Sequence, residues 1–205
     1  MTPNPSKILP SAWSPVTRPL PPVLLASRSP RRVELLRQIL PGFETVPSNA
    51  VELEDGSLGA RRLCELNAQR KALAMSERFP DHLVIGADTL VFLDGAPLAK
   101  PADLADAKGM LSRLSGRTHE VVTGVCLVLA RASRMRLLSE VTYVRFRTLD
   151  DAVIEDYLGR VDVLDKAGAY AVQEHGERIV ERIEGSLTNV IGLPLEALRG
   201  ALERW

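Results

Sequence analysis

The chain has 205 residues, of which 45% are hydrophobic and 4% aromatic, enough apolar material for one large domain or for two lobes on a shared core. Its 26 lysines and arginines balance 26 aspartates and glutamates, so the formal charge of zero argues against a general nucleic-acid or membrane binder. The two cysteines, Cys64 and Cys126, have no Cys or His at metal-ligand spacing, and we expect buried free thiols in a reducing, cytoplasmic setting.

The first 22 residues differ in composition from the rest of the chain. They contain seven of the 14 prolines and no sustained apolar run, which argues against a secretory signal or a membrane span. No later stretch is long and apolar enough to cross a bilayer. The sequence therefore predicts a flexible, Pro-rich segment over 1–22, followed by a folded domain over 23–205.

The first half of this domain alternates strands and helices. A helix is expected to begin at Pro30, with Ser29 as its N-cap, because proline at the first helical position costs no hydrogen bond. A longer helix is expected over 60–79, and its apolar face is assigned to Leu63, Leu66 and Leu73. The strands of this half are expected over 23–26, within 41–47, and over 82–95, the last broken at Gly86 and ending in an Asp-Gly turn.

Hairpin signals dominate the second half. A helix capped by Asp103 is expected to run through Leu114 and to end at Gly116. Thr148 and Asp151 read as a capping box for another helix, which ends near Gly159. Strands are expected in two long runs within 119–147 and at 168–173 and 178–183, with a final helix within 192–205. Together these patterns predict a mixed sheet with flanking helices, of the α/β or α+β class.

The stretch "LLASRSPRRVELL", residues 24–36, places hydroxyls and arginines where a strand becomes a helix. A helix N-terminus presents free N–H groups and a positive dipole end, so Ser27, Arg28, Arg31 and Arg32 form a candidate phosphate cradle. The alternatives are a capped surface helix with solvated arginines, or a basic turn for the DNA minor groove. The second alternative is disfavoured, because such turns occur in repeated copies within basic tails. The chain has no Walker or dinucleotide-binding glycine motif.

Two acidic sites could serve catalysis. Asp88 follows the apolar run "VIGA", so its carboxylate is expected at the end of a buried strand, where α/β sheets place ligand sites. Asp88 could instead cap the turn that follows. The loop "VELED" at 51–55 is either solvated or close to Asp88, in which case Glu52 or Glu54 could complete a site for a hard cation such as Mg²⁺ or Mn²⁺.

Three lysines could join these acids. Lys71 lies at the margin of the apolar face of its helix, where it either snorkels to solvent or reaches a cleft. Lys100 lies one hairpin after Asp88, and Lys166 precedes three small residues in "LDKAGAYAVQEHG". Several cations and two acids near strand ends suit metal-assisted attack on a polyphosphate.

The motifs "LASRSPRRVELL", "VIGADTLV", "LAKP", "MLSRLSGRTHEVVTGV", "LDKAGAYAVQ" and "GSLTNVIGLPL" resemble the Maf family of nucleoside triphosphate pyrophosphatases, from about Val23 to the C-terminus. The resemblance implies an elongated α/β fold like that of inosine triphosphate pyrophosphatases, a mixed twisted sheet with two lobes around a cleft. It also implies hydrolysis of a nucleoside triphosphate to the monophosphate and pyrophosphate with a divalent metal (Mg, Mn or Co). Family members are usually cytoplasmic homodimers, and neither nucleic acid nor membrane is an expected partner.

Carried over by position, the resemblance makes Asp88 the proton acceptor and links Glu52 to the metal and its water. Asp88 could instead help Glu52 hold the metal, and the sequence does not separate these two roles. Other positions are linked to the triphosphate: Ser27, Arg32, Lys71, Lys100 and Lys166. Arg31, Thr89 and Gln173 are linked to substrate choice, in the combination of the subfamily that prefers dTTP and UTP. Val163 departs from the proline that many members have there. The alternative function is a nucleotide-sensing regulatory protein linked to septum formation, although such a protein would tolerate loss of these acids and lysines.

Overall fold

One seven-stranded mixed sheet organises residues 13–205, the part of the chain that the computed structural model describes. The strand order is β2-β1-β3-β5-β6-β7, with β4 paired to β3; β1 is parallel to both neighbours, and the other pairs are antiparallel. The strands are β1 Val23–Leu25, β2 Glu44–Thr45, β3 Leu83–Leu93, β4 Ala96–Leu98, β5 Thr118–Leu129, β6 Arg134–Phe146 and β7 Val180–Glu184. The predicted mixed sheet with flanking helices, of the α/β class, is confirmed.

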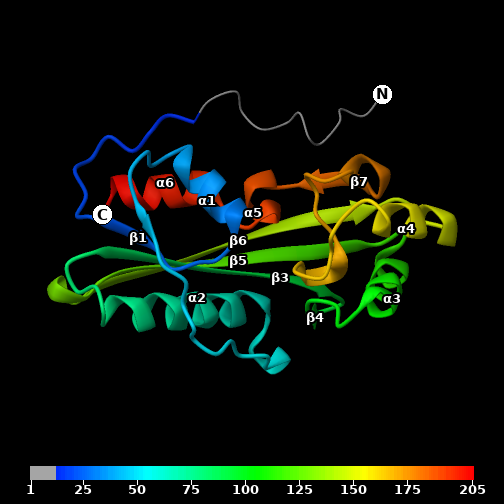
Figure 1. Ribbon diagram of the computed structural model, residues 1–205, viewed down its shortest axis with the longest axis horizontal. Helices are drawn as coiled ribbons and strands as arrows, with labels where there is room; N and C mark the ends of the chain where they lie inside the picture. Colours follow the sequence, from blue (N-terminus) through cyan, green and yellow to red (C-terminus); the bar gives the residue numbers. More distant parts are fainter. Residues whose placement is uncertain (1–12) are drawn as a thin grey trace.

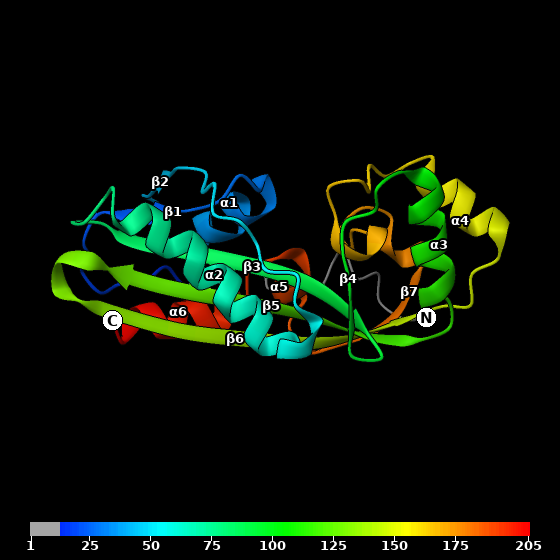
Figure 2. The same ribbon diagram turned by 90° about the horizontal axis from the view of Figure 1, so that it is seen from below.

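Helices cover both faces of the sheet. Figure 1 shows α2 on one face and α1, α5 and α6 on the other, while α3 and α4 gather at the far end of the long strands, as Figure 2 also shows. The helices are α1 Pro30–Arg37, α2 Ala60–Ser76, α3 Leu104–Leu114, α4 Asp151–Leu158, α5 Leu187–Ile191 and α6 Leu195–Glu203. No helix in this described part of the chain is both long and apolar enough to span a bilayer.

The hydrophobic core is divided into two parts along the sheet, and each part forms one lobe of the molecule. In the first lobe, alternate residues of β3 face opposite layers: Leu83 and Ile85 pack with α1 and α6, and Val84 packs with α2. In the second lobe, the far ends of β3 and β5 pack with α3, α4 and β7 around buried Phe146 and Tyr157. The long antiparallel strands β3, β5 and β6 run through both lobes, so the sheet joins them.

Helix α2 lies unusually close to the sheet. A Cβ atom at Gly86 would lie 2.8 Å from Ala72 N, and one at Gly124 would lie 2.6 Å from Glu65 N, so only glycine fits beneath the helix at these positions. The predicted helix face is therefore wrong in part, because Leu73 is 40% exposed and the buried residues are mostly small: Leu63, Cys64, Asn67, Ala68, Ala72, Met75 and Ser76. The predicted break at Gly86 is also wrong, since Gly86 pairs with Cys126 in register.

Several local signals are confirmed. Ser29 caps α1 with Pro30 at its start, and Asp103 caps α3 by accepting from Asp106 N at 2.8 Å. Asp94 and Gly95 have φ angles of 53° and 79° in the turn between β3 and β4, the left-handed values that an Asp-Gly hairpin requires. Both cysteines are free and buried.

Two other local predictions are wrong. Asp150, and not the Thr148–Asp151 box, caps α4, because its carboxylate accepts from Val153 N at 2.9 Å. Residues 168–173 form no strand, since Gly168 and Ala169 have φ angles of 71° and 61°, which an extended chain does not allow. This segment instead begins with the short 3₁₀ helix η4, Ala167–Ala169.

The segment over 13–22 has no regular secondary structure but lies against the first lobe. Val16 N donates to Ile39 O at 2.8 Å, and Thr17 N donates to Glu203 Oε1 at 2.9 Å. Trp13, Val16 and Leu20 pack on the core between α1 and α6. The first 12 residues of the predicted flexible segment fall outside the described part of the chain, so the boundary at 22 stays a prediction.

Candidate active site

A cavity of about 950 Å³ lies where the two lobes meet. The first lobe contributes the β1–α1 junction, the acidic loop before α2, and α2 itself; the second lobe contributes the loop after β4 and the segment around η4. The ten residues that the family resemblance assigns to the site all line this cavity: Ser27, Arg31, Arg32, Glu52, Lys71, Asp88, Thr89, Lys100, Lys166 and Gln173.

Asp88 and Lys71 form the centre of the site. Asp88 lies in the middle of β3 and not at the strand end that the sequence predicted, because the strand continues without a break past it. It shares the face of β3 that packs against α2, because it follows Val84 and Gly86 at the two-residue period of a strand. It is only 3% exposed, and its Oδ1 lies 2.6 Å from Lys71 Nζ. The same ammonium lies 2.6 Å from Glu52 Oε1. Lys71 therefore reaches the cavity and does not extend to solvent.

The acidic loop meets this pair through Glu52. Partial burial acts to raise the pKa of Glu52, but Lys71, Lys100 and Arg32 outweigh it, and the pKa lies below its ordinary value. Glu54 also lines the cavity, yet within the described chain it has no ion-pair partner. Of the two acids left open by the sequence, Glu52 is the one that contacts Lys71.

Asn67 is a site residue that sequence reasoning missed. Its amide donates from Nδ2 to Asp88 Oδ2 and to Leu53 O, both at 3.1 Å, and its Oδ1 accepts from Leu53 N at 2.7 Å. Asn67 thus joins the acidic loop to Asp88. The signal was present in the sequence: Asn67 precedes Lys71 by four residues, so the two side chains share one helix face.

The basic junction surrounds Arg32. Its guanidinium donates from Nε to Gly192 O at 2.9 Å, from Nη2 to Thr89 Oγ1 at 3.0 Å, and from Nη1 to Ser27 Oγ at 3.5 Å. Burial lowers the pKa of Arg32, although the Asp88 carboxylate acts to raise it. Thr89 follows Asp88 and so faces the opposite side of β3, which explains why it meets Arg32 and not Lys71.

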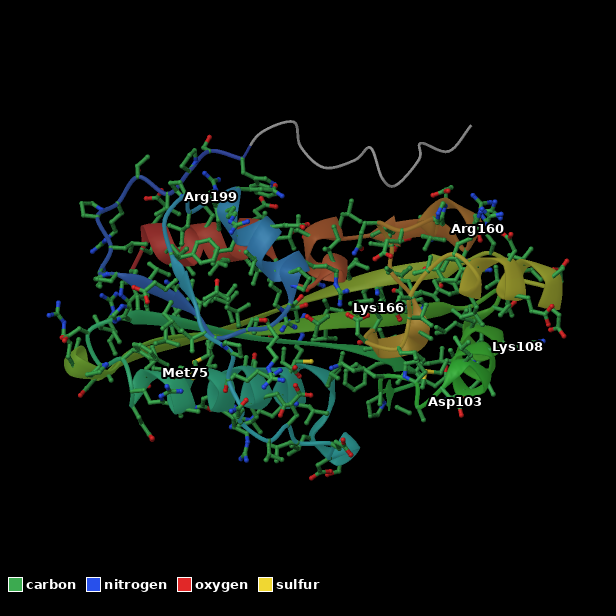
Figure 3. The ribbon with its side chains drawn as sticks, in the orientation of Figure 1. Met75, Asp103, Lys108, Arg160, Lys166 and Arg199 are labelled. Carbon is green, nitrogen blue, oxygen red and sulfur yellow. The ribbon has the colours of Figure 1, made fainter. Side chains whose placement is uncertain are left out.

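Asp165, an acid that the sequence did not single out, joins Arg31 and Lys166 across the cavity. Asp165 Oδ2 lies 3.2 Å from Arg31 Nη1, and Asp165 Oδ1 lies 2.7 Å from Lys166 Nζ. Lys166 is buried and also donates to Asp162 O. Figure 3 shows Lys166 between the lobes, toward the middle of the long axis, whereas Lys108 lies on α3 near the end.

Two cavity residues retain unused polar groups. Among the residues that the structure describes, Lys100 forms neither an ion pair nor a hydrogen bond, and its side chain is exposed. Gln173 Oε1 is buried without a hydrogen-bond partner. Because a buried oxygen without a partner is costly, Gln173 Oε1 is a candidate acceptor for a ligand N–H group.

The residues present fit a divalent metal that arrives with a phosphate ligand. Within residues 13–205 there is no cluster of three or more His, Cys, Asp or Glu that could hold a metal ion by itself. Glu52 and Asp88, however, approach one point closely enough to share the Lys71 ammonium. Mg²⁺ is commonly bound by one or two carboxylates together with water and substrate phosphates, and this donor set suits that arrangement.

Comparison with known proteins finds relatives over most of the chain. Residues 22–205 match the family described as Maf-like protein. The chain is 48% identical to the dTTP/UTP pyrophosphatase of Akkermansia muciniphila, over 86% of this chain and 92% of that protein. It is 42% identical to the dTTP/UTP pyrophosphatase of Pelotomaculum thermopropionicum (89% and 96% covered) and 45% identical to that of Symbiobacterium thermophilum (84% and 88% covered). The chain therefore belongs to the Maf family.

Proposed function

We propose that this protein is a nucleoside triphosphate pyrophosphatase that hydrolyses dTTP and UTP to the monophosphate and pyrophosphate. The observation that carries the proposal is that a buried carboxylate, Asp88, shares one cavity with the Arg32 junction and three lysines: Lys71, Lys100 and Lys166. The relatives named dTTP/UTP pyrophosphatase, which cover most of this chain, support the substrate and the reaction.

The cations are proposed to bind the triphosphate. Lys100 breaks no ion pair when it binds phosphate, since within the described chain it forms none. Arg32 is held by three oxygens and can turn little, so it supplies a fixed positive charge beside Ser27. Lys71 and Lys166 start from ion pairs and would exchange a carboxylate for phosphate oxygens, which are strong charge-assisted acceptors. Holding the chain of phosphates in this way orients the scissile anhydride.

Asp88 is proposed to accept the proton of the attacking water. Asn67 donates to its Oδ2 and Lys71 donates to its Oδ1, and these two hydrogen bonds fix the plane of the carboxylate. As the water oxygen bonds to phosphorus, its proton passes to Asp88, the α–β anhydride bond breaks, and pyrophosphate leaves. Glu52 and Asp88 are the residues that would hold a divalent cation (Mg²⁺, Mn²⁺ or Co²⁺), which supplies charge neutralisation on phosphate when bound.

Base choice is proposed to depend on Gln173, with Arg31 and Thr89 beside the phosphates. Uracil and thymine present an N–H group between two carbonyl oxygens, and Gln173 Oε1 offers the acceptor that this N–H needs. The 5-methyl group changes none of these bonds, so both bases are accepted. Thr89 acts through Arg32, because its hydroxyl accepts from that guanidinium at 3.0 Å.

The assembly is proposed to be a cytoplasmic homodimer whose folded domain spans 23–205, with no nucleic-acid or membrane partner. These points rest on the family resemblance. Light scattering of the purified protein measures the oligomeric state.

A pyrophosphate-release assay on a panel of canonical triphosphates and 7-methyl-GTP, with Mg²⁺, Mn²⁺ or Co²⁺ and with a chelator, tests the function. We expect dTTP and UTP to be the best canonical substrates and the chelator to abolish turnover. Absence of turnover for every triphosphate would instead favour a nucleotide-sensing binding protein, and faster turnover of 7-methyl-GTP would overturn the substrate assignment.

A further inference from the structure

A single carboxylate links the two lobes across the cavity. Asp165 belongs to the second lobe, in the loop between α4 and η4, and its Oδ2 lies 3.2 Å from Nη1 of Arg31, a first-lobe residue in the first turn of α1. Its other oxygen, Oδ1, lies 2.7 Å from Lys166 Nζ. Each carboxylate oxygen of Asp165 thus pairs with a different cation, and the proposed function assigns both cations to substrate binding.

The Asp165 side chain is negatively charged and partly exposed. Partial burial acts to raise the pKa of this carboxyl, but Lys166 and Arg31 outweigh it, so the pKa lies below its ordinary value and Asp165 is ionised at neutral pH. Its side chain is 57% exposed, while those of Arg31 and Lys166 are 25% and 8% exposed. Because ion pairs with an exposed member are weak, this carboxylate can be exchanged for a stronger anion.

The other cations of the cavity are arranged differently. Lys71 is held between Asp88 and Glu52, the two acids proposed to act in the reaction. The Asp165 carboxylate contacts none of the groups proposed to act on the attacking water, and its side-chain partners are Arg31 and Lys166. A polyphosphate offers the same two cations more charge and more acceptor oxygens.

We propose that Asp165 is an internal anion that holds Arg31 and Lys166 together across the cavity and that the polyphosphate of a ligand displaces it. This inference rests on the proposed function, because that function supplies the polyphosphate. Asp165 is accordingly a positioning residue. Before the ligand binds, it holds the two lobes in place through Arg31 and Lys166, and its competition with the ligand weakens substrate binding. After the reaction it pairs with the two cations again and so assists release of pyrophosphate.

Displacement predicts that removal of this carboxylate strengthens polyphosphate binding. Asp165→Asn keeps the side-chain shape and removes the competing charge, and the affinity for inorganic tripolyphosphate is expected to rise about threefold to tenfold, the range set by weak ion pairs. The KM for UTP is expected to fall by a similar factor without a rise in kcat, because the gain concerns binding common to ground and transition states. A residue needed only for folding would lower affinity when replaced.

The test is calorimetric titration of the full chain with tripolyphosphate, using Asp165→Asn and a charge-matched control, Glu174→Gln. Glu174 Oε1 lies 3.8 Å from Lys166 Nζ but does not contact Arg31, so its replacement changes the net charge equally and leaves the link between lobes intact. A gain confined to Asp165→Asn, and reduced in the double variant Arg31→Ala/Asp165→Asn, supports displacement. An equal gain in Glu174→Gln reduces the effect to general charge and overturns the inference, as does an unchanged or weaker affinity in Asp165→Asn.

Two further measurements keep the outcome decisive. Asp165→Ser carries the same expectation as Asp165→Asn, so poor folding of one variant does not prevent the test. Tripolyphosphate binding requires no catalysis, so a protein that binds it with the predicted gain yet hydrolyses no triphosphate sinks the proposed function alone. Turnover of UTP with no affinity gain, or absence of tripolyphosphate binding, sinks the displacement role.

Discussion

Lys71 Nζ lies 2.6 Å from Asp88 Oδ1, which joins helix α2 to the middle of β3 at the floor of the cavity. Asp88→Asn keeps the shape of this side chain and can still accept from Lys71, but it removes the charge needed to accept a proton. We expect pyrophosphate release from UTP to fall by about 10² or more, as for lost acid–base groups, while the protein still folds. A near wild-type rate would contradict the role of Asp88.

Glu52 and Glu54 provide a matched pair of substitutions on one loop. Glu52→Gln removes a carboxylate 2.6 Å from Lys71, whereas Glu54→Gln removes one without an ion-pair partner in the described chain. Glu52→Gln is expected to raise the Mg²⁺ concentration needed for half-maximal turnover by about tenfold or more, because a divalent metal depends on its carboxylate ligands. Glu54→Gln is expected to change it much less. Equal shifts in the two variants would remove the reason to prefer Glu52.

Lys100 is expected to act on phosphate and not on the base. Lys100→Ala should raise the KM for every triphosphate by a similar factor, about tenfold, because an ammonium group recognises the phosphates that all nucleotides share. Lys108→Ala is the control, since Lys108 lies on α3 outside the cavity and pairs with Glu155 at 2.8 Å. Steady-state kinetics with dTTP, UTP, CTP and ATP measure the effect, and a changed substrate ranking in Lys100→Ala would contradict a phosphate role.

Gln173→Leu is expected to weaken recognition of the base. The substitution leaves the polar edge of a bound uracil or thymine unpaired, at a cost of about 1–3 kcal/mol. The ratio of kcat/KM for UTP over that for purine triphosphates should fall correspondingly, while the release of pyrophosphate from the best substrate continues. An unchanged ratio in Gln173→Leu would show that the base is recognised elsewhere.

Gly86→Ala is expected to disturb the site through packing. The new Cβ would lie 2.8 Å from Ala72 N and closer still to Ala68 O, so α2 must move away from β3 and take Asn67 and Lys71 with it. We expect the free energy of unfolding to fall by about 1–3 kcal/mol and turnover to fall as well. Gly109→Ala is the control, because Gly109 is exposed in α3 with no atom within 4 Å of its added Cβ. That change should stabilise the protein by about 0.5–1 kcal/mol. Chemical denaturation measures both variants, and equal stabilities would contradict the close packing.

The sequence by itself determined the features that depend on neighbouring residues. The N-cap at Ser29, the cap at Asp103 and the Asp-Gly turn at Asp94 are local, since each needs only a side chain and backbone groups a few residues away. The strand and helix periods likewise predicted the mixed sheet. The resemblance of the motifs to the Maf family, and not any local pattern, selected the ten residues that line one cavity.

The tertiary structure alone decided which of these residues meet, because such contacts join segments that lie far apart in the chain. Apolar counting favoured Leu73 for the buried face of α2, but glycines on β3 and β5 bring the helix so close that small residues occupy that face. The same close approach brings the side chains of Asn67 and Lys71 within hydrogen-bond distance of the Asp88 carboxylate. Asp165 meets Arg31, 134 residues away, because the sheet joins the two lobes, and no local pattern in the sequence encodes that distance.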